Sequence, residues 1–105
     1  METRELAGKT IEFDADGFMS KLEDWNEEVA VELAKEEGIE SLNDRHWIVL
    51  NFMRNVFREK GDAPSMRKLT KESGVPTKEL YQLFPKGPAK KSAKIAGLPK
   101  PKGCI

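Results

Sequence analysis

The sequence predicts a small, mainly α-helical bundle that begins with a β-hairpin, contains a helix-turn-helix-like element and ends in a flexible C-terminal arm. Its 105 residues suit one domain with one core. Helix-capping residues followed by apolar residues three or four apart recur along most of the chain, whereas strand-like alternation is confined to the first thirteen residues. Hydrophobic residues, at 38%, are enough for a folded core. We therefore expect a domain over residues 1–96 and the arm over residues 97–105.

The first thirteen residues are expected to form the hairpin. Two short strands flank Ala7-Gly8-Lys9, and Ile11 and Phe13 fall on one face of the second strand. Residues 14–17 (DADG) have the composition of a turn. A connecting segment then brings three apolar side chains to the core: Phe18, Leu22 and Trp25.

Two helices follow, and each starts at an asparagine cap. Asn26 precedes a helix that stops at Gly38, and Asn43 precedes a longer helix that ends at Gly61. Apolar residues wrap more than one face of the longer helix, which makes it the candidate for a central helix contacted on several sides. His46, in its first turn, is the chain's one histidine and is interpreted as structural rather than as a metal ligand.

Three short helices complete the predicted bundle, at residues 65–73, 77–84 and 89–96. The last of them is basic and ends at Gly97. The tail from residue 98 to residue 105 has no core-forming pattern, and Pro99 and Pro101 favour an extended path. We therefore expect the arm to be flexible.

The helices at residues 65–73 and 77–84 resemble the helix-turn-helix of bacterial repressors. In a DNA-binding protein the second helix would enter the major groove, and Thr77, Lys78 and Gln82 would be its contacts. The same spacing arises in any compact pair of helices whose apolar residues pack together, and no dimerisation segment follows. A DNA-binding regulator is therefore the lowest-ranked function.

The net charge of zero hides a division along the chain. Residues 1–62 hold 16 acidic and 8 basic residues, whereas residues 63–105 hold 2 and 10, so the halves carry −8 and +8. Two interpretations are open. The halves attract each other within the fold, which we favour, or the basic half faces an anionic partner.

The sequence contains no signal for a cofactor or a metal centre. Residues 12–23 approach the spacing of a calcium loop but begin with glutamate after a strand, so an acidic turn is the better interpretation. The first residues lack the pattern of a signal peptide, and no apolar run approaches the roughly 20 residues of a membrane span. The expected location is the cytoplasm, without a membrane partner.

Cys104 is the single cysteine and the candidate catalytic residue. It stands near the end of a basic arm, where Lys100 and Lys102 favour the thiolate and the C-terminal carboxylate opposes it. Only a small fraction of an ordinary cysteine is thiolate at neutral pH. Such a group suits a carrier that is activated in a partner's site better than an enzyme with independent turnover.

Residues 83–90 (LFPKGPAK) and 94–105 (KIAGLPKPKGCI) together resemble the DsrC/TusE family of sulfur-carrier proteins. The resemblance extends through residues 14–18 and the helix start at His46, and so covers nearly the whole chain. It implies a small helical domain with an N-terminal hairpin, a helix-turn-helix-like element and a mobile arm. In that arm the penultimate cysteine, here Cys104, carries sulfur as a persulfide or trisulfide.

The resemblance implies one of two sulfur pathways. Family members that serve dissimilatory sulfite reductase have a second arm cysteine where this chain has Ala93, which favours the single-cysteine, TusE-like form and 2-thiolation of the tRNA wobble uridine. Gly103 and the short link between the helix-turn-helix-like helices resemble DsrC as much as TusE, so dissimilatory sulfur metabolism stays open. The implied partners are an upstream sulfur-carrier complex and a downstream tRNA-thiolating enzyme or sulfite reductase-type complex. Direct nucleic-acid binding is not expected.

Basic side chains are expected to surround the arm. Lys100 and Lys102 would assist thiolate formation and docking, and Arg67, Lys90 and Lys94 would form a basic floor beneath the arm. An ordinary solvated face is the alternative interpretation for the last three residues.

Overall fold

The computed structural model describes residues 2–101. Along these residues a two-stranded sheet, a short 3-10 helix and five α-helices follow one another. This order confirms the predicted mainly helical fold with an N-terminal hairpin. The elements are β1 (Glu2–Leu6), β2 (Lys9–Phe13), η1 (Leu22–Asp24), α1 (Glu27–Glu36), α2 (Asp44–Lys60), α3 (Met66–Glu72), α4 (Thr77–Leu83) and α5 (Pro88–Ile95).

The hairpin pairs β1 and β2 in antiparallel register, with Leu6 opposite Lys9 next to the turn. Ala7 and Gly8 make the turn with φ of +50° and +77°, the left-handed pair that a two-residue type I′ connection requires. Phe13 is fully buried on β2, as is Ile11. The predicted inward face of the second strand is therefore confirmed.

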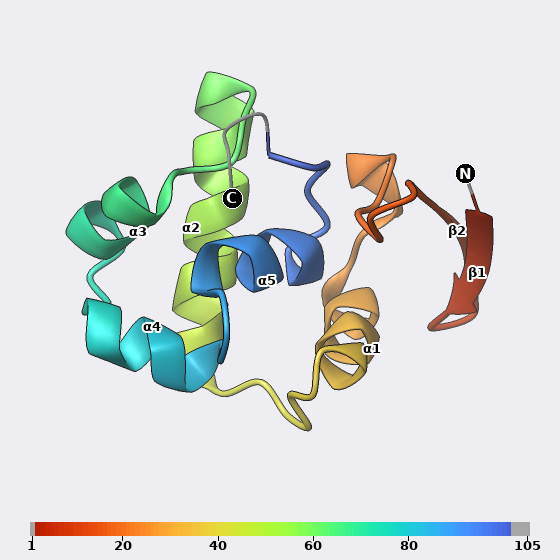
Figure 1. Cartoon of the computed structure of the whole chain (residues 1–105). Helices are drawn as coiled ribbons and strands as arrows, with labels where there is room; N and C mark the ends of the chain where they lie inside the picture. The colour runs from red at the N-terminus through yellow and green to blue at the C-terminus, as the bar shows by residue number, and fades with distance from the viewer. Residues whose placement is uncertain (1, 102–105) are drawn as a thin grey trace.

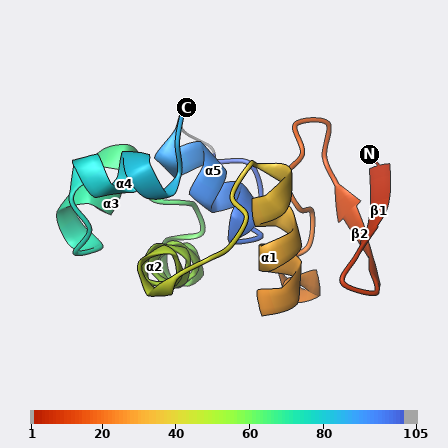
Figure 2. The same cartoon turned by 90° about the horizontal axis from the view of Figure 1, so that it is seen from below.

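The helices are arranged around α5. Figure 1 shows α5 crossing α2, with α3 and α4 on one side and α1 on the other. Seen from below in Figure 2, the hairpin lies at the edge of the molecule beyond α1. The contacts agree with the pictures, because α5 packs against α1, α2, α3 and α4.

The prediction that the long helix after Asn43 is the central one is therefore wrong. Its buried residues lie along one side, whereas Ile48 is 41% exposed. The inward residues of α5 are small, among them Ala89, Ser92 and Ala93. Because the distance between packed helices depends on the side chains at their contact, this short helix can approach several neighbours closely.

The predicted helix caps at asparagine are confirmed. The side chain of Asn26 accepts a hydrogen bond from the Val29 N–H at 2.8 Å at the start of α1. Asn43 accepts from the Arg45 and His46 N–H groups at the start of α2. At the other end of α1, Gly38 has φ of +85° and terminates the helix where the sequence predicts.

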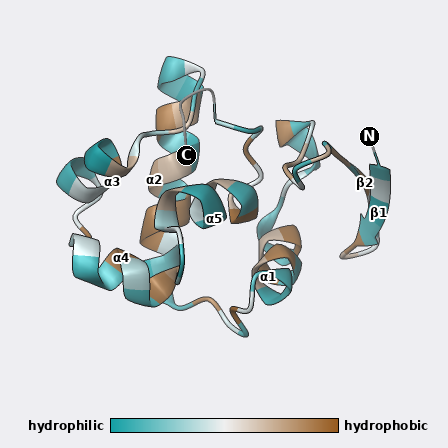
Figure 3. Ribbon diagram, viewed as in Figure 1, coloured by the Kyte–Doolittle hydropathy of each residue, from teal (hydrophilic) through white to brown (hydrophobic). Residues whose placement is uncertain are grey.

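The core fills the space between the helices. Its largest fully buried side chains come from β2, from the turn that follows it, from all five α-helices and from segments that follow them, and include Phe13, Phe18, Leu50, Met53 and Phe84. Figure 3 shows that α1, α2 and α5 each carry both hydrophobic and hydrophilic stretches. Trp25 and Leu22 pack against this core as partly buried residues, in agreement with the prediction for the connecting segment.

The helix-turn-helix-like pair is formed by α3 and α4, as predicted. Its apolar residues face inward: Leu69, Val75, Leu80 and Phe84 are all fully buried. On the side that faces α2, Arg45 donates two hydrogen bonds of 2.8 Å to the Glu79 carboxylate. The hydrogen bonding from Arg45 lowers the pKa of Glu79.

Candidate functional site

The candidate site is the place where the C-terminal arm leaves the body of the protein. Cys104, the proposed reactive residue, and Lys102 lie outside the described residues, and so does the expected flexibility of the arm after residue 101. The described chain reaches Pro101. We call residues 95–101, which run from the end of α5 into the arm, the arm root.

A tight backbone turn forms the first part of the arm root. The N–H of Gly97 donates to the Lys94 carbonyl at 3.1 Å, and the N–H of Leu98 donates to the Ala93 carbonyl at 3.0 Å. These two bonds are those of a Schellman motif, with Gly97 in the left-handed conformation at φ of +74°. The predicted end of the last helix at Gly97 is confirmed.

Leu98 corrects the prediction that the tail contributes nothing to the core. Its side chain is fully buried and belongs to the main hydrophobic cluster. The Schellman turn explains this position, because the residue after the left-handed glycine folds back onto the last turn of the helix. The first residues of the arm, through Leu98, are therefore packed into the body.

Two side chains from distant elements hold the carbonyl groups at the end of α5. The indole Nε1 of Trp25 donates to the Ile95 carbonyl at 2.8 Å, and Arg54 Nη1 donates to the Ala96 carbonyl at 2.7 Å. The Arg54 guanidinium carbon also lies 4.1 Å from the centre of the Trp25 ring, a cation–π distance. Burial, aided by the nearby charge of Arg58, lowers the pKa of Arg54.

Trp25 also sets the path of the backbone at Gly97. A Cβ atom at that glycine would lie 2.3 Å from Trp25 Cδ1 and 2.6 Å from Cγ. These distances are far inside van der Waals contact, so only glycine fits the turn as it stands. The same indole thus positions the Ile95 carbonyl and the glycine that follows.

An exposed ion pair joins the arm to the turn after β2. Lys100 Nζ lies 2.8 Å from an Asp16 carboxylate oxygen. The hydrogen bond and the charge of Lys100 lower the pKa of Asp16, and Lys90 and Lys94 add to this effect. In turn, the hydrogen bond from Asp16 raises the pKa of Lys100. The arm root is therefore tied to the body on both sides of Pro99.

The structure brings three of the predicted basic residues to one side of the molecule. Lys94 Nζ lies 5.3 Å from the centre of the Phe18 ring, in the same turn as Asp16. Lys90 acts on the same carboxylate through its charge, as does Lys100. Arg67 instead is exposed on α3 and, within residues 2–101, makes no hydrogen bond or ion pair with the arm root.

The structure gives His46 the structural role that the sequence predicts. Its Nδ1 accepts the Asn43 N–H at 3.1 Å, so the ring proton sits on Nε2, which donates to the Leu83 carbonyl at 3.0 Å. The ring meets Phe84 edge-on at 5.2 Å. His46 thus completes the cap of α2 and fixes α2 against the end of α4.

The acidic turn after β2 uses a carboxylate to shape its backbone. Asp14 Oδ1 accepts the N–H groups of Asp16 and Phe18 at 2.9 and 3.0 Å, as an aspartate does in a turn. Within residues 2–101, no three His, Cys, Asp or Glu side chains are grouped closely enough to hold a metal ion. In the same part of the chain, no helix is long and apolar enough to cross a membrane.

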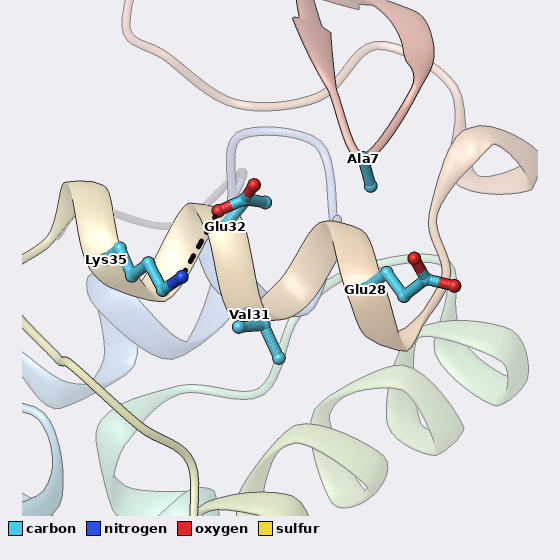
Figure 4. Close-up of a pocket in the computed structure, with 5 residues that line it drawn as sticks. All are labelled: Ala7, Glu28, Val31, Glu32 and Lys35. Carbon is cyan, nitrogen blue, oxygen red and sulfur yellow. Dashed lines mark ion pairs between the residues drawn. The ribbon is translucent and has the colours of Figure 1, made fainter.

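An open hollow of about 250 Å³ lies between the hairpin turn and α1. Figure 4 shows its lining, in which Ala7 faces Glu28, Val31 and Glu32 of α1 and Lys35 pairs with Glu32 at 3.8 Å. This lining has no nucleophile and no pairing of an acid with a base suited to catalysis. The hollow therefore adds no chemistry to the site at the arm root.

Sequence reasoning missed Arg54 and the interaction between Asp16 and Lys100. A signal for Arg54 existed, because it takes one position of the apolar spacing Leu50, Met53 and Phe57 on α2. A single arginine on the apolar side of a helix needs a partner for its charged head. The ion pair of Asp16 with Lys100, in contrast, joins residues 84 positions apart. No local sequence pattern predicts it.

Comparisons with known proteins agree on one family. The family model described as DsrC like protein matches residues 5–105. Sulfurtransferase TusE of Escherichia coli strain K12 is 45% identical over an alignment of 105 positions, which covers 93% of this chain and 95% of that protein. The gamma subunit of the dissimilatory-type sulfite reductase of Nitratidesulfovibrio vulgaris Hildenborough is 41% identical over 98 residues, which cover 93% of each chain.

The fold agrees with solved structures as well. The crystal structure of dissimilatory sulfite reductase I (DsrI) contains a chain that matches with a TM-score of 0.89 and 39% identity. The match covers 99% of this chain and 100% of that chain. The hairpin, the five helices and the described part of the arm therefore have a counterpart of known structure.

Proposed function

The chain belongs to the DsrC-like family, and from this premise we propose that it is a sulfur carrier whose thiol is Cys104. The observation that carries the proposal is the position of this thiol. Cys104 is the chain's one cysteine, it falls within the matched residues 5–105, and it follows the arm root by three residues. A thiol at the end of an anchored arm is suited to delivery into the site of another protein.

The transfer chemistry needs no cofactor. The Cys104 thiolate attacks the outer sulfur of a donor persulfide, so the donor S–S bond breaks, a new S–S bond forms at Cys104 and the donor leaves as a thiolate. In the second step an acceptor thiolate attacks the outer sulfur on Cys104, which leaves as a thiolate. Each step exchanges one S–S bond for another without net oxidation.

The favoured pathway is 2-thiolation of the tRNA wobble uridine. Two features support it: relatives named sulfurtransferase TusE are 45% identical to this chain, and Ala93 leaves the chain with one thiol. The partners of this pathway are an upstream sulfur-carrier complex and a downstream tRNA-thiolating enzyme, with the cytoplasm as the compartment. Lys90, Lys94 and Lys100, which surround the Asp16 turn, are the proposed docking residues next to the arm.

A role in dissimilatory sulfur metabolism is the second candidate function. It is supported by the gamma subunit of sulfite reductase, at 41% identity, and by the close fit to the DsrI structure. In that pathway the partner of Cys104 is a sulfite reductase-type complex. The same carrier chemistry serves both pathways, and only the acceptor differs.

The carrier function is tested by intact mass. The protein is incubated with polysulfide or with a cysteine desulfurase relay, and we expect a mass gain of one sulfur atom that reductant removes. Cys104→Ser should gain no sulfur under the same conditions. A gain that persists in Cys104→Ser would exclude Cys104 as the carrier.

The pathway is tested with the loaded protein. Protein carrying the persulfide is offered separately to a tRNA-thiolating enzyme with tRNA and to a sulfite reductase, and loss of the extra sulfur is followed by mass. We expect transfer to the tRNA-thiolating enzyme and formation of 2-thiouridine. Transfer to the sulfite reductase alone would establish the second candidate.

A further inference from the structure

The end of α5 is held by groups that the helix itself does not supply. The last carbonyls of a helix have no partner within it and are met by water, by a turn or by other side chains. Here Trp25 donates to the Ile95 carbonyl and Arg54 donates to the Ala96 carbonyl. The segment before α1 and the middle of α2 are far apart in the sequence. They thus meet at the last carbonyl groups of α5, where the arm begins.

The Arg54 contact is directional as well as attractive. Its guanidinium is held from two sides, with the Trp25 ring centre at 4.1 Å and the Ala96 oxygen at 2.7 Å. A planar guanidinium that stacks on a ring while donating in its plane has little freedom to turn. The carbonyl that accepts this bond belongs to the peptide group that joins Ala96 to Gly97, so the bond fixes that peptide plane.

The direction of the arm depends on this peptide plane. Gly97 has φ of +74° and no room for a side chain against Trp25. Leu98 is buried directly after it. Cys104 stands seven residues beyond Gly97, so a rotation at the start of the arm redirects everything that follows.

We propose that Arg54 is a positioning residue for sulfur transfer, because its hydrogen bond to the Ala96 carbonyl and its stacking on Trp25 set the direction in which the arm carries Cys104 toward a partner. The inference rests on the proposed carrier function and deepens it. Arg54 does not touch the reacting sulfur atoms. It acts by presenting the thiol, and misplacement of a reacting group is costly even when its chemistry is unchanged.

The test compares loading by a small molecule with transfer between proteins. Arg54→Met removes the donor and keeps an unbranched stem, and Arg58→Met is the matched control. Arg58 lies one turn later on the exposed side of α2 and pairs only with Asn55 among the described residues. Both variants lose one positive charge from the same helix, so a general charge effect should appear in both.

The expected results separate positioning from reactivity. Loading of Arg54→Met by polysulfide should stay within about twofold of the wild type, because the thiol itself is unchanged. Transfer from a cysteine desulfurase relay should fall about tenfold in its rate at saturating partner concentration, with little change in KM. Arg54→Lys, which keeps a charged donor, should recover part of the loss, and Arg58→Met should behave as the wild type.

Other results would overturn the inference. Equal losses in polysulfide loading and in protein transfer would mean that Arg54 affects the fold or the thiol, and unchanged transfer would mean that it does not position the arm. If Arg54→Met does not fold, as judged by circular dichroism, Arg54→Lys decides the question, because it keeps a charged donor but loses the planar group that lies over the Trp25 ring. Wild-type transfer by Arg54→Lys would then exclude the proposal.

A spectroscopic measurement tests the inference without sulfur chemistry, so that it can fail separately from the proposed function. A nitroxide on Cys104, the chain's one thiol, broadens the amide signals of the body residues that it approaches. In the wild type we expect broadening over a restricted part of the body, and in Arg54→Met over a wider part. Identical broadening in the two proteins would overturn the positioning role even if Cys104 carries sulfur.

Discussion

Gly97 shows how one residue without a side chain can decide the course of the arm. Its φ of +74° lies in the region that glycine enters without strain. In addition, the space where a Cβ would stand is occupied by Trp25, with Cδ1 at 2.3 Å and Cγ at 2.6 Å. Both the conformation and the packing therefore require glycine, and the second requirement is specific to this site.

We predict that Gly97→Ala destabilises the protein by about 2–4 kcal/mol, because it adds backbone strain and displaces the indole. Gly61→Ala is the control, since Gly61 has a similar φ of +76° but open space around its Cα. It should cost only about 1 kcal/mol. Urea unfolding followed by circular dichroism measures both values. If the two variants lose the same free energy of unfolding, Trp25 moves aside without destabilising the protein.

The ion pair between Asp16 and Lys100 makes a prediction about pH. The pKa of Asp16 is lowered in the folded protein, so its contribution to stability is present above the unfolded value of about 3.9 and is lost as the pH falls through the folded value. The pKa of Lys100 is raised, so its contribution is present below about 10.4 and is lost as the pH rises through the folded value. The ion pair should therefore be intact between about pH 5 and pH 9.

The measurement is an NMR titration of the Asp16 side-chain carboxyl carbon. In the wild type the midpoint should lie below about 3.9, and in Lys100→Met it should move up toward that value. Lys21→Met serves as a control, because Lys21 is not among the groups that lower the Asp16 pKa. A midpoint that is the same in all three proteins would show that the arm is not held at Asp16 in solution.

At the scale of elements, the sequence predicts a helix boundary well where neighbouring residues determine that boundary. Asn26 and Asn43 are followed directly by their helices, and Gly38 and Gly97 end helices by a backbone conformation that few other residues adopt. These boundaries could therefore be predicted residue by residue. The central position of α5 could not, because it depends on four other helices meeting the small residues of one short helix.

The same distinction applies to the candidate site. The position of Cys104 and the basic character of its arm are properties of the sequence. The hydrogen bond from Arg54 to Ala96 arises only when segments 42 residues apart come together. The carrier residue could thus be proposed from the sequence, whereas the group that anchors its arm could not.

The helix-turn-helix-like pair gives a prediction about DNA. Leu69, Leu80 and Leu83 of α3 and α4 are buried within the protein, whereas Tyr81 is exposed on α4. Thr77, Lys78 and Gln82 are the exposed candidates for contacts. A domain of zero net charge offers little electrostatic affinity for phosphates, so DNA binding should be weak and independent of sequence. Fluorescence anisotropy with random and genomic duplexes at physiological salt measures it. Submicromolar, sequence-selective binding that Gln82→Ala weakens would support a regulator instead.

At the scale of the whole molecule, ion pairs join the two oppositely charged halves of the chain. Asp16 of the first half pairs with Lys100 of the second, and Lys90 and Lys94 act on the same carboxylate through their charges. Arg45 of the first half pairs with Glu79 of the second, with the signs reversed. Arg67, Lys71 and Lys78 are exposed on α3 and α4, so these three side chains are accessible to an anionic partner.

Ala93 connects the packing of the whole molecule to the chemistry of two-cysteine family members. It lies near the end of α5, as predicted, is fully buried, and its carbonyl accepts the Leu98 N–H. A thiol introduced by Ala93→Cys would therefore point into the core. A disulfide requires the two Cα atoms to lie about 4.4 to 6.8 Å apart, so the arm root must open before the introduced thiol can meet Cys104.

We predict that Ala93→Cys forms an intramolecular disulfide under mild oxidation, at a rate set by this opening. The rate should become independent of oxidant concentration once oxidation is faster than opening, and Gly97→Ala should increase it by weakening the turn. Lys94→Cys places the thiol at the neighbouring, partly exposed position. Its disulfide should form at a rate proportional to the oxidant concentration. Mass loss of two hydrogens and faster migration without reductant report the bond. If the rate of disulfide formation in Ala93→Cys rises linearly with oxidant concentration, position 93 is open in solution. If only intermolecular dimers form, the arm does not return to the body.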